Sequence, residues 1–223
     1  MSTPSEGAEE LLGSSVRQLL DDVGARTTAP GGGAVTGIVA ALAGALATMC
    51  GRFADGQSVS AAERAEDLQI RAASLAEADP VVYAAYVRAR RERLDSAKVS
   101  AALDRAIRVP LEVAEVAAEL VQIASELAQS GNPRLRGDAM TAMFLAAAAA
   151  RAAAVLVCEN LAGEGEGEDP GLVLAATLLA SVDAAEQAAM SVYPALTPPP
   201  LCRANMQTQG SARAAIGVYR PLG

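Results

Sequence analysis

Two aspartates and a run of glycines are the residues whose types and positions in this sequence could do chemistry. Residues 30–33 read Pro-Gly-Gly-Gly and stand directly before an apolar segment. Glycines permit a tight turn, and they leave the backbone N–H groups of a helix start open to a ligand. Asp79 and Asp138 each stand at a predicted helix start, where a carboxylate can cap the helix or move protons.

The sequence contains no histidine, which excludes histidine metal sites and catalytic pairs that need an imidazole. Any general acid or base must then be Asp, Glu, Tyr, Cys or the single lysine, Lys98. Asn132 and Asn160 could hydrogen-bond a heterocycle or stabilise developing charge, although either could equally be a turn or cap residue. The three cysteines are widely spaced, which fits reduced thiols and a cytoplasmic location better than disulfides or a zinc site.

The charge of the chain restricts its partners. Its formal net charge is −8, which argues against nucleic acid because no surplus of cations is present to displace phosphate counterions. An anionic small molecule could still bind the arginines in segment 88–93, whose alternative role is a solvated helix end. The apolar stretches 34–50 and 139–150 are predicted to be helices buried in a soluble core rather than membrane spans.

The elements that must position these residues are predicted to be helices throughout. Hydrophobic residues make up 52% of the chain and aromatic residues only 3%, so Ala, Leu and Val dominate. We expect an all-α bundle of long Ala-rich helices in residues 1–190, followed by an irregular Pro-rich tail in residues 191–223. Periodicity and cap residues predict helices over residues 9–23, 34–54 and 60–78, and another that begins at Pro80 and includes Val87. A further helix follows the charged segment and ends near residue 108. The remaining predicted helices cover residues 110–129, 138–161 and 170–190. Asp79, Asp138 and Asp169 are expected to be N-caps, and Pro80 and Pro110 to begin helices.

The motifs occur in a characteristic order along about residues 10–190. They read T-A-P-G-G-G (28–33), A-D-P-V-V-Y (78–83), V-P-L-E-V-A (109–114), G-N-P-R-L-R-G-D (131–138) and C-E-N-L (158–161). This series resembles the cyclodeaminase domain of formiminotransferase-cyclodeaminase and the stand-alone bacterial methenyltetrahydrofolate cyclohydrolases.

The resemblance implies an all-helical domain that dimerises and holds a folate near the glycine turn. Such enzymes eliminate ammonia from 5-formiminotetrahydrofolate or hydrate 5,10-methenyltetrahydrofolate, and need no metal or redox cofactor. Asp79 and Asp138 would then be the catalytic acid and base groups. The residues expected to bind the ligand are Gly31, Gly32, Gly33, Tyr83, Asn132 and Asn160.

The sequence departs from the family pattern at several polar positions. Ala34 and Gly137 replace serines, and Leu156 replaces the first asparagine of the N-V-x-x-N-L motif. Two alternatives therefore stand beside the folate enzyme. The same scaffold could cyclise, deaminate or hydrolyse another small molecule, or the chain could be a non-catalytic helical binding or assembly protein.

Overall fold

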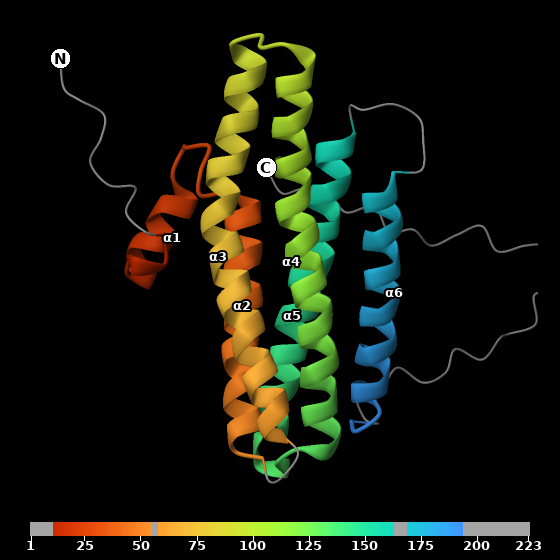
Figure 1. Cartoon of the computed structure of the whole chain (residues 1–223). Helices are drawn as coiled ribbons and strands as arrows, with labels where there is room; N and C mark the ends of the chain where they lie inside the picture. Colours follow the sequence, from red (N-terminus) through yellow and green to blue (C-terminus); the bar gives the residue numbers. More distant parts are fainter. Residues whose placement is uncertain (1–10, 55–57, 163–168, 194–223) are drawn as a thin grey trace, which may run out of the picture.

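A computed structural model of the chain describes residues 11–54, 58–162 and 169–193 (Figure 1). These residues form helices and contain no strand, which confirms the predicted all-α class. The predicted tail begins at residue 191, and its residues from 194 onward lie outside the described part. The elements in chain order are η1 (Leu11–Gly13), α1 (Val16–Gly24), α2 (Gly32–Arg52), α3 (Ser58–Arg91), α4 (Ser96–Ser130), η2 (Pro133–Leu135), α5 (Arg136–Leu161) and α6 (Pro170–Met190).

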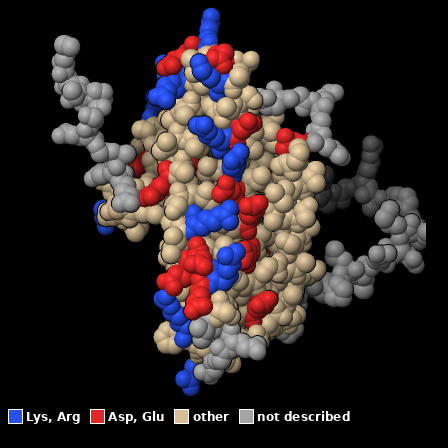
Figure 2. Space-filling model, in the orientation of Figure 1, with Lys and Arg blue, Asp and Glu red and all other residues tan. Residues whose placement is uncertain are grey.

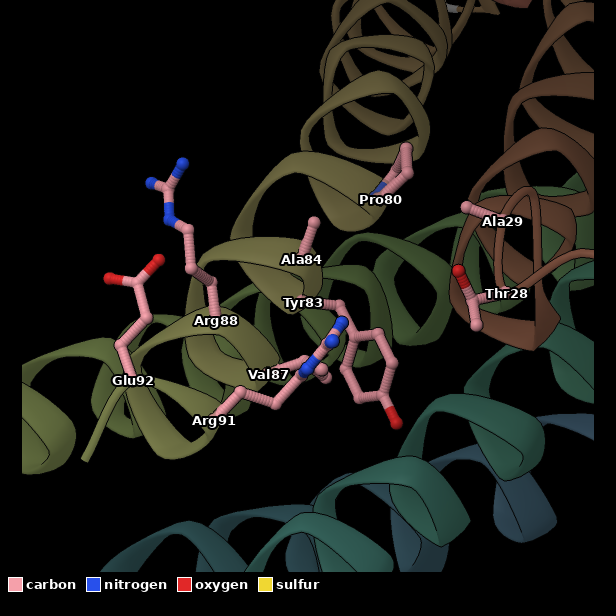
Figure 3. A pocket seen from close by; sticks show the side chains of 9 residues that line it. All are labelled: Thr28, Ala29, Pro80, Tyr83, Ala84, Val87, Arg88, Arg91 and Glu92. Carbon is pink, nitrogen blue, oxygen red and sulfur yellow. The ribbon is translucent and has the colours of Figure 1, made fainter.

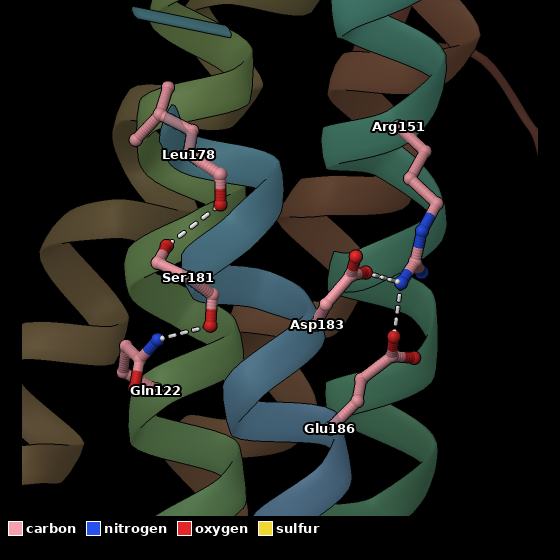
Figure 4. A network of polar contacts seen from close by, with 6 residues as sticks. All are labelled: Gln122, Arg151, Leu178, Ser181, Asp183 and Glu186. Atoms are coloured by element: carbon pink, nitrogen blue, oxygen red, sulfur yellow. Dashed lines mark hydrogen bonds and ion pairs between the residues drawn. The ribbon is translucent and has the colours of Figure 1, made fainter. Parts of the chain in front are cut away.

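Helices α2, α3, α4 and α5 run side by side as an up-and-down bundle, because short connections join antiparallel neighbours. Helix α6 packs on α4 and α5. The η1 turn contacts α3, and the α1 helix that follows it buries none of its residues (Figure 1). Figure 4 shows the polar contacts that hold α6 in place: Arg151 of α5 pairs with Asp183 and Glu186, and Gln122 of α4 donates to the Ser181 carbonyl at 3.1 Å.

Small residues allow α2 and α3 to approach closely. Gly37, Gly44 and Gly51 recur every seven residues on α2 and face Ala76, Gln69 and Ala62 of α3 in reverse order. A Cβ added to any of these glycines would lie 2.8–2.9 Å from the facing side chain. The core around this contact is mostly alanine, so its stability depends on many close contacts rather than on large side chains.

Two predicted helix starts are wrong. Pro80 and Pro110 lie inside α3 and α4, each of which continues through its proline. A proline cannot donate to the carbonyl four residues earlier, which normally interrupts a helix. Here both helices run the length of the bundle and pack against each other, and this packing outweighs one missing hydrogen bond.

Two of the three predicted aspartate caps are also wrong. Asp79 lies within α3, and Asp138 lies in the first turn of α5, whose N-cap is Leu135. The short η2 turn, capped by Asn132, starts the helix earlier than the sequence pattern suggested. The prediction for Asp169 is confirmed, because its carboxylate accepts a hydrogen bond from the Gly171 N–H at 2.7 Å.

Charged residues gather on one face of the bundle. Figure 2 shows arginines and carboxylates interleaved along α3 and α4, where Arg64 pairs with Glu119 and Arg71 with Glu112. The segments Gly32–Arg52, Pro133–Leu161 and Pro170–Met190 are apolar and long enough to cross a membrane, by length and composition only. Half of the most apolar window in each of the first two is buried inside the bundle.

Candidate functional site

The start of α2 has no cap from its own segment. Its N-cap, Gly31, has an extended backbone and no side chain that could accept from the first turn. The cap comes instead from α3, where Asp79 lies over Gly33 and accepts a hydrogen bond from the Ala34 N–H. A Cβ on Gly33 would collide with the Asp79 carboxylate, so this glycine makes the contact possible.

Burial controls the protonation of Asp79. Loss of solvent around its carboxyl group raises the pKa above the ordinary value of 3.8, and the hydrogen bond from the Ala34 N–H opposes this rise only in part. The side chain therefore keeps its proton to a higher pH than an exposed aspartate does. Such a group is better suited than an exposed aspartate to donating a proton to a bound molecule.

A pocket of about 310 Å³ opens at this point of the bundle. It brings together the glycine turn with Asp79, Tyr83 and Asn160, four parts of the site that the sequence predicted. The lining residues are Thr28, Ala29, Gly31, Gly32, Gly33, Asp79, Pro80, Tyr83, Pro110, Leu156, Glu159 and Asn160. Backbone N–H groups at the α2 start, a half-buried carboxyl group and an amide side chain thus surround one cavity.

Asn160 is held in the pocket wall by a hydrogen bond to α4. Its Nδ2 atom donates to the Ala106 carbonyl at 2.9 Å. Ala106 is four residues before Pro110, so its carbonyl has no backbone donor within the helix. The side chain of Asn160 replaces that donor, which joins α5 to α4 beside the pocket.

A larger pocket of about 560 Å³ adjoins the first and shares Thr28, Ala29, Pro80 and Tyr83 with it (Figure 3). Its outer part is lined by Arg88 and Arg91 on the last turn of α3 and by Glu92, which follows the helix. Arg90, in the same turn, instead donates to the Tyr86 hydroxyl at 3.0 Å. The two pockets together offer a polar end at Asp79, an aromatic ring in the middle and a positively charged end.

Asn132 and Asp138 do not belong to this site within one chain. Asn132 donates to the carbonyl of Phe53, the C-cap of α2, at 3.1 Å, and Asp138 acts electrostatically on Cys50 near the same end. The glycine turn is at the other end of α2, which has 21 residues. At 1.5 Å per residue the two ends are about 30 Å apart. Within one chain, Asp138 and the glycine turn therefore do not form a single site.

Cys50 is a buried thiol at this distal end. Burial raises its pKa to about 11, and the negative charge of Asp138 contributes to the rise. The thiol is 3.9 Å from the Leu135 carbonyl. Among the described residues, no three acidic or cysteine side chains gather as metal ligands would.

Glu159, Leu156 and Pro110 line the pocket, and the sequence did not single them out as ligand-binding residues. Pro110 was interpreted as a helix start, and Leu156 only as a departure from a motif. Glu159 directly precedes Asn160 on α5, so its proximity was the one available signal.

Comparisons of the sequence and of the structure with known proteins point to the same family. A family model described as "Formiminotransferase-cyclodeaminase" matches residues 15–166. The chain is 35% identical over 158 residues to formimidoyltransferase-cyclodeaminase of Rattus norvegicus, and 33% identical over 157 residues to that of Sus scrofa. Each match covers 62% of this chain but only 29% of the relative.

A solved structure extends the likeness to the fold. The crystal structure of formiminotetrahydrofolate cyclodeaminase from Thermotoga maritima matches with a TM-score of 0.74 and 25% sequence identity. The match covers 80% of this chain and 94% of that one.

Proposed function

The chain belongs to the formiminotransferase-cyclodeaminase family, and from this premise we propose that it is an enzyme acting on a C=N bond of a folate-type one-carbon adduct. The substrate in this proposal is 5-formimino- or 5,10-methenyltetrahydrofolate. The observation that carries it is the half-buried Asp79 carboxyl group, whose pKa is raised, at a pocket formed by the start of α2.

In the cyclodeaminase reaction the folate N10 attacks the formimino carbon, and the carbon–nitrogen bond to the leaving ammonia breaks. The leaving nitrogen needs two protons to depart as ammonia: one comes from N10 and one is taken up from solvent, so the neutral formimino compound plus one proton gives the methenyl cation and ammonia. Asp79 can carry the N10 proton to the leaving nitrogen, because burial raises its pKa and so favours the protonated form that donates.

In the cyclohydrolase reaction water adds to the methenyl carbon and the bond from that carbon to N5 breaks; of the two protons of the water, N5 takes up one and the other is released. Ionised Asp79 would accept the proton of the attacking water. Asp138 cannot reach this pocket within the same chain, so the proposal gives the acid–base role to Asp79.

The adjoining pocket suits the remainder of a folate. Tyr83 lies where the two pockets meet and can stack on an aromatic ring. Arg88 and Arg91 line the outer part and can pair with glutamyl carboxylates. This arrangement supports a ligand with a heterocycle at one end and carboxylates at the other.

We also propose that the chain forms a homodimer through α2 and α5. Leu42, Phe144 and Val155 on these helices are 58%, 46% and 59% exposed, so the two helices present apolar side chains that a second copy of the chain could cover. Analytical ultracentrifugation should give a dimer mass for the wild type and a lower mass for Leu42→Glu. A monomer at every concentration tested would contradict this proposal.

One observation favours the alternative of a non-folate substrate. Leu156 lines the pocket and packs near Gly32, at a position where the family pattern has an asparagine. An apolar side chain there removes a hydrogen-bonding group from the site. A smaller or more apolar molecule with a C=N bond would tolerate this change better than a pterin.

The proposed function is tested by the absorbance decay of 5,10-methenyltetrahydrofolate with purified protein, together with ammonia release from the formimino compound. We expect acceleration by the wild type and a loss of about 100-fold or more in Asp79→Asn, as for removal of a general acid–base group. Asp67→Asn is a matched control, because Asp67 is an exposed aspartate on the same helix. No acceleration, together with no heat of folate binding in calorimetry, would overturn the proposal.

A further inference from the structure

We infer that Pro110 and Asn160 act as one specificity device, in which the proline makes the asparagine present its carboxamide oxygen to the ligand. The inference deepens the proposed function and rests on it for the identity of the ligand. It assigns to the α5 wall of the pocket a hydrogen-bond acceptor that requires an N–H or O–H donor on the bound molecule.

The first step concerns the backbone of α4. In an unbroken helix the N–H of residue 110 would donate to the carbonyl of Ala106. Pro110 has no N–H, although α4 continues on both sides of it. Ala106 is buried, so water does not readily replace the missing donor. The sequence thus creates one carbonyl that needs a partner from outside its own helix.

The second step concerns the side chain that supplies this partner. Asn160 Nδ2 donates to the Ala106 carbonyl at 2.9 Å. The carboxamide group is planar, with its oxygen and nitrogen on opposite branches, so fixing the nitrogen also fixes the oxygen. Among the described residues, none donates a hydrogen bond to the oxygen of Asn160. Because this side chain lines the pocket, its oxygen and the second N–H of Nδ2 are left for a ligand, and the oxygen is the acceptor of the two.

The third step concerns the hydrogen-bonding groups that the ligand must carry. Asn160, Glu159 and ionised Asp79 all supply acceptors to the same pocket. A molecule that places N–H groups against this wall is favoured, as the amino-substituted ring of a reduced pterin can do. A molecule with only acceptors on that edge would leave the oxygen of Asn160 unpaired, which is unfavourable in a half-buried site.

Asn160 could instead have a purely structural role, as the donor to the Ala106 carbonyl. Two substitutions distinguish this structural role from the role of ligand acceptor. Asn160→Leu leaves the Ala106 carbonyl without a donor and removes the acceptor. Adding Pro110→Ala to that variant returns a backbone N–H to Ala106, because residue 110 can then complete the helix. The double variant therefore restores the structural bond but not the acceptor.

The first measurement uses the free, full-length protein and follows the side-chain amide signals of ¹⁵N-labelled chain by NMR. We expect the Asn160 amide protons to exchange slowly in the wild type. They should become fast-exchanging in Pro110→Ala, where a backbone N–H competes for the carbonyl. An Asn160 signal unchanged by Pro110→Ala would overturn the coupling of the two residues, whether or not the protein binds folate.

The second measurement is calorimetry with 5-formyltetrahydrofolate as the probe, combined with thermal unfolding. We expect Asn160→Leu to lower both the affinity, by about tenfold, and the melting temperature. The double variant should recover the melting temperature but not the affinity. Recovery of both would show that Asn160 is only structural and would overturn the inference. No binding by the wild type would refute the proposed function, and the NMR result would then decide the coupling alone.

Discussion

Asp79 on α3 caps the start of α2 by occupying the space next to Gly33 that a side chain would need. This contact links the two sequence features that first suggested chemistry. It places a carboxyl group with a raised pKa beside the exposed N–H groups of a helix start. The first two predictions test this contact.

Gly33→Ala should displace the Asp79 carboxylate, because the new methyl group would collide with it. We expect a loss of about 1 kcal/mol in the free energy of unfolding, the typical value of an N-cap, and a large loss of activity. Gly137→Ala is the matched control, since a Cβ there meets nothing within 4 Å. Urea unfolding and the methenyl assay measure both effects, and equal behaviour of the two variants would contradict the assignment.

The raised pKa of Asp79 predicts a pH-dependent stability. The native state keeps this proton at pH values where the unfolded chain, with a pKa near 3.8, has lost it. The native state then binds more protons, so the free energy of unfolding falls as the pH rises through this window. Asp79→Asn should lack this fall, and its stability relative to the wild type should increase with pH. Urea titrations at a series of pH values measure the difference, and parallel curves would contradict it.

Arg88 and Arg91 should contribute to the affinity for ligands that carry carboxylates. Both side chains line the outer pocket and are open to solvent. An ion pair between either guanidinium and a ligand carboxylate should therefore contribute about 1 kcal/mol to binding, or roughly fivefold in Kd. The double change to Gln should weaken binding of a folate and reduce its dependence on salt. Arg134→Gln is the control, because Arg134 lies in the η2 turn at the distal end of the bundle. An equal effect of the control would argue against a specific site.

Cys50 and Cys158 should differ in reactivity toward thiol reagents. Burial raises the pKa of Cys50 to about 11, so almost no thiolate forms near neutral pH, whereas Cys158 is exposed. In a chain with Cys202 replaced by Ala, we expect one thiol to react quickly and the second only after unfolding. Mass spectrometry of the labelled peptides identifies each thiol. Rapid labelling of Cys50 in the folded protein would contradict its burial.

The close contact of α2 and α3 depends on glycine. Gly44→Ala places a methyl group 2.9 Å from the side chain of Gln69 and 3.0 Å from its backbone, so the helices must separate. We expect a loss of about 1–3 kcal/mol, the usual cost of overpacking a core. Thermal unfolding checks this, again against Gly137→Ala. A melting temperature equal to that of the control would show that the bundle accommodates the methyl group.

The amino-acid sequence was sufficient to predict the helical class and part of the site. Apolar periodicity, an alanine-rich composition and turn residues are local properties, so they identify most helices without knowledge of their packing. The glycine turn and Asp79 were recognisable for the same reason. A glycine run can bare backbone N–H groups and an aspartate can transfer protons, wherever the fold places these residues.

Only the tertiary structure decided how these parts combine. Local rules place helix starts at Pro80 and Pro110, yet packing along the whole bundle keeps α3 and α4 continuous. Asp79 caps a neighbouring helix instead of its own, because the close antiparallel contact of α2 and α3 brings it to Gly33. Asp138 lies about 30 Å away, since α2 separates the two ends of the bundle and rises 1.5 Å per residue. Motif order along the chain carries no information about such distances, which depend on the length and direction of each helix.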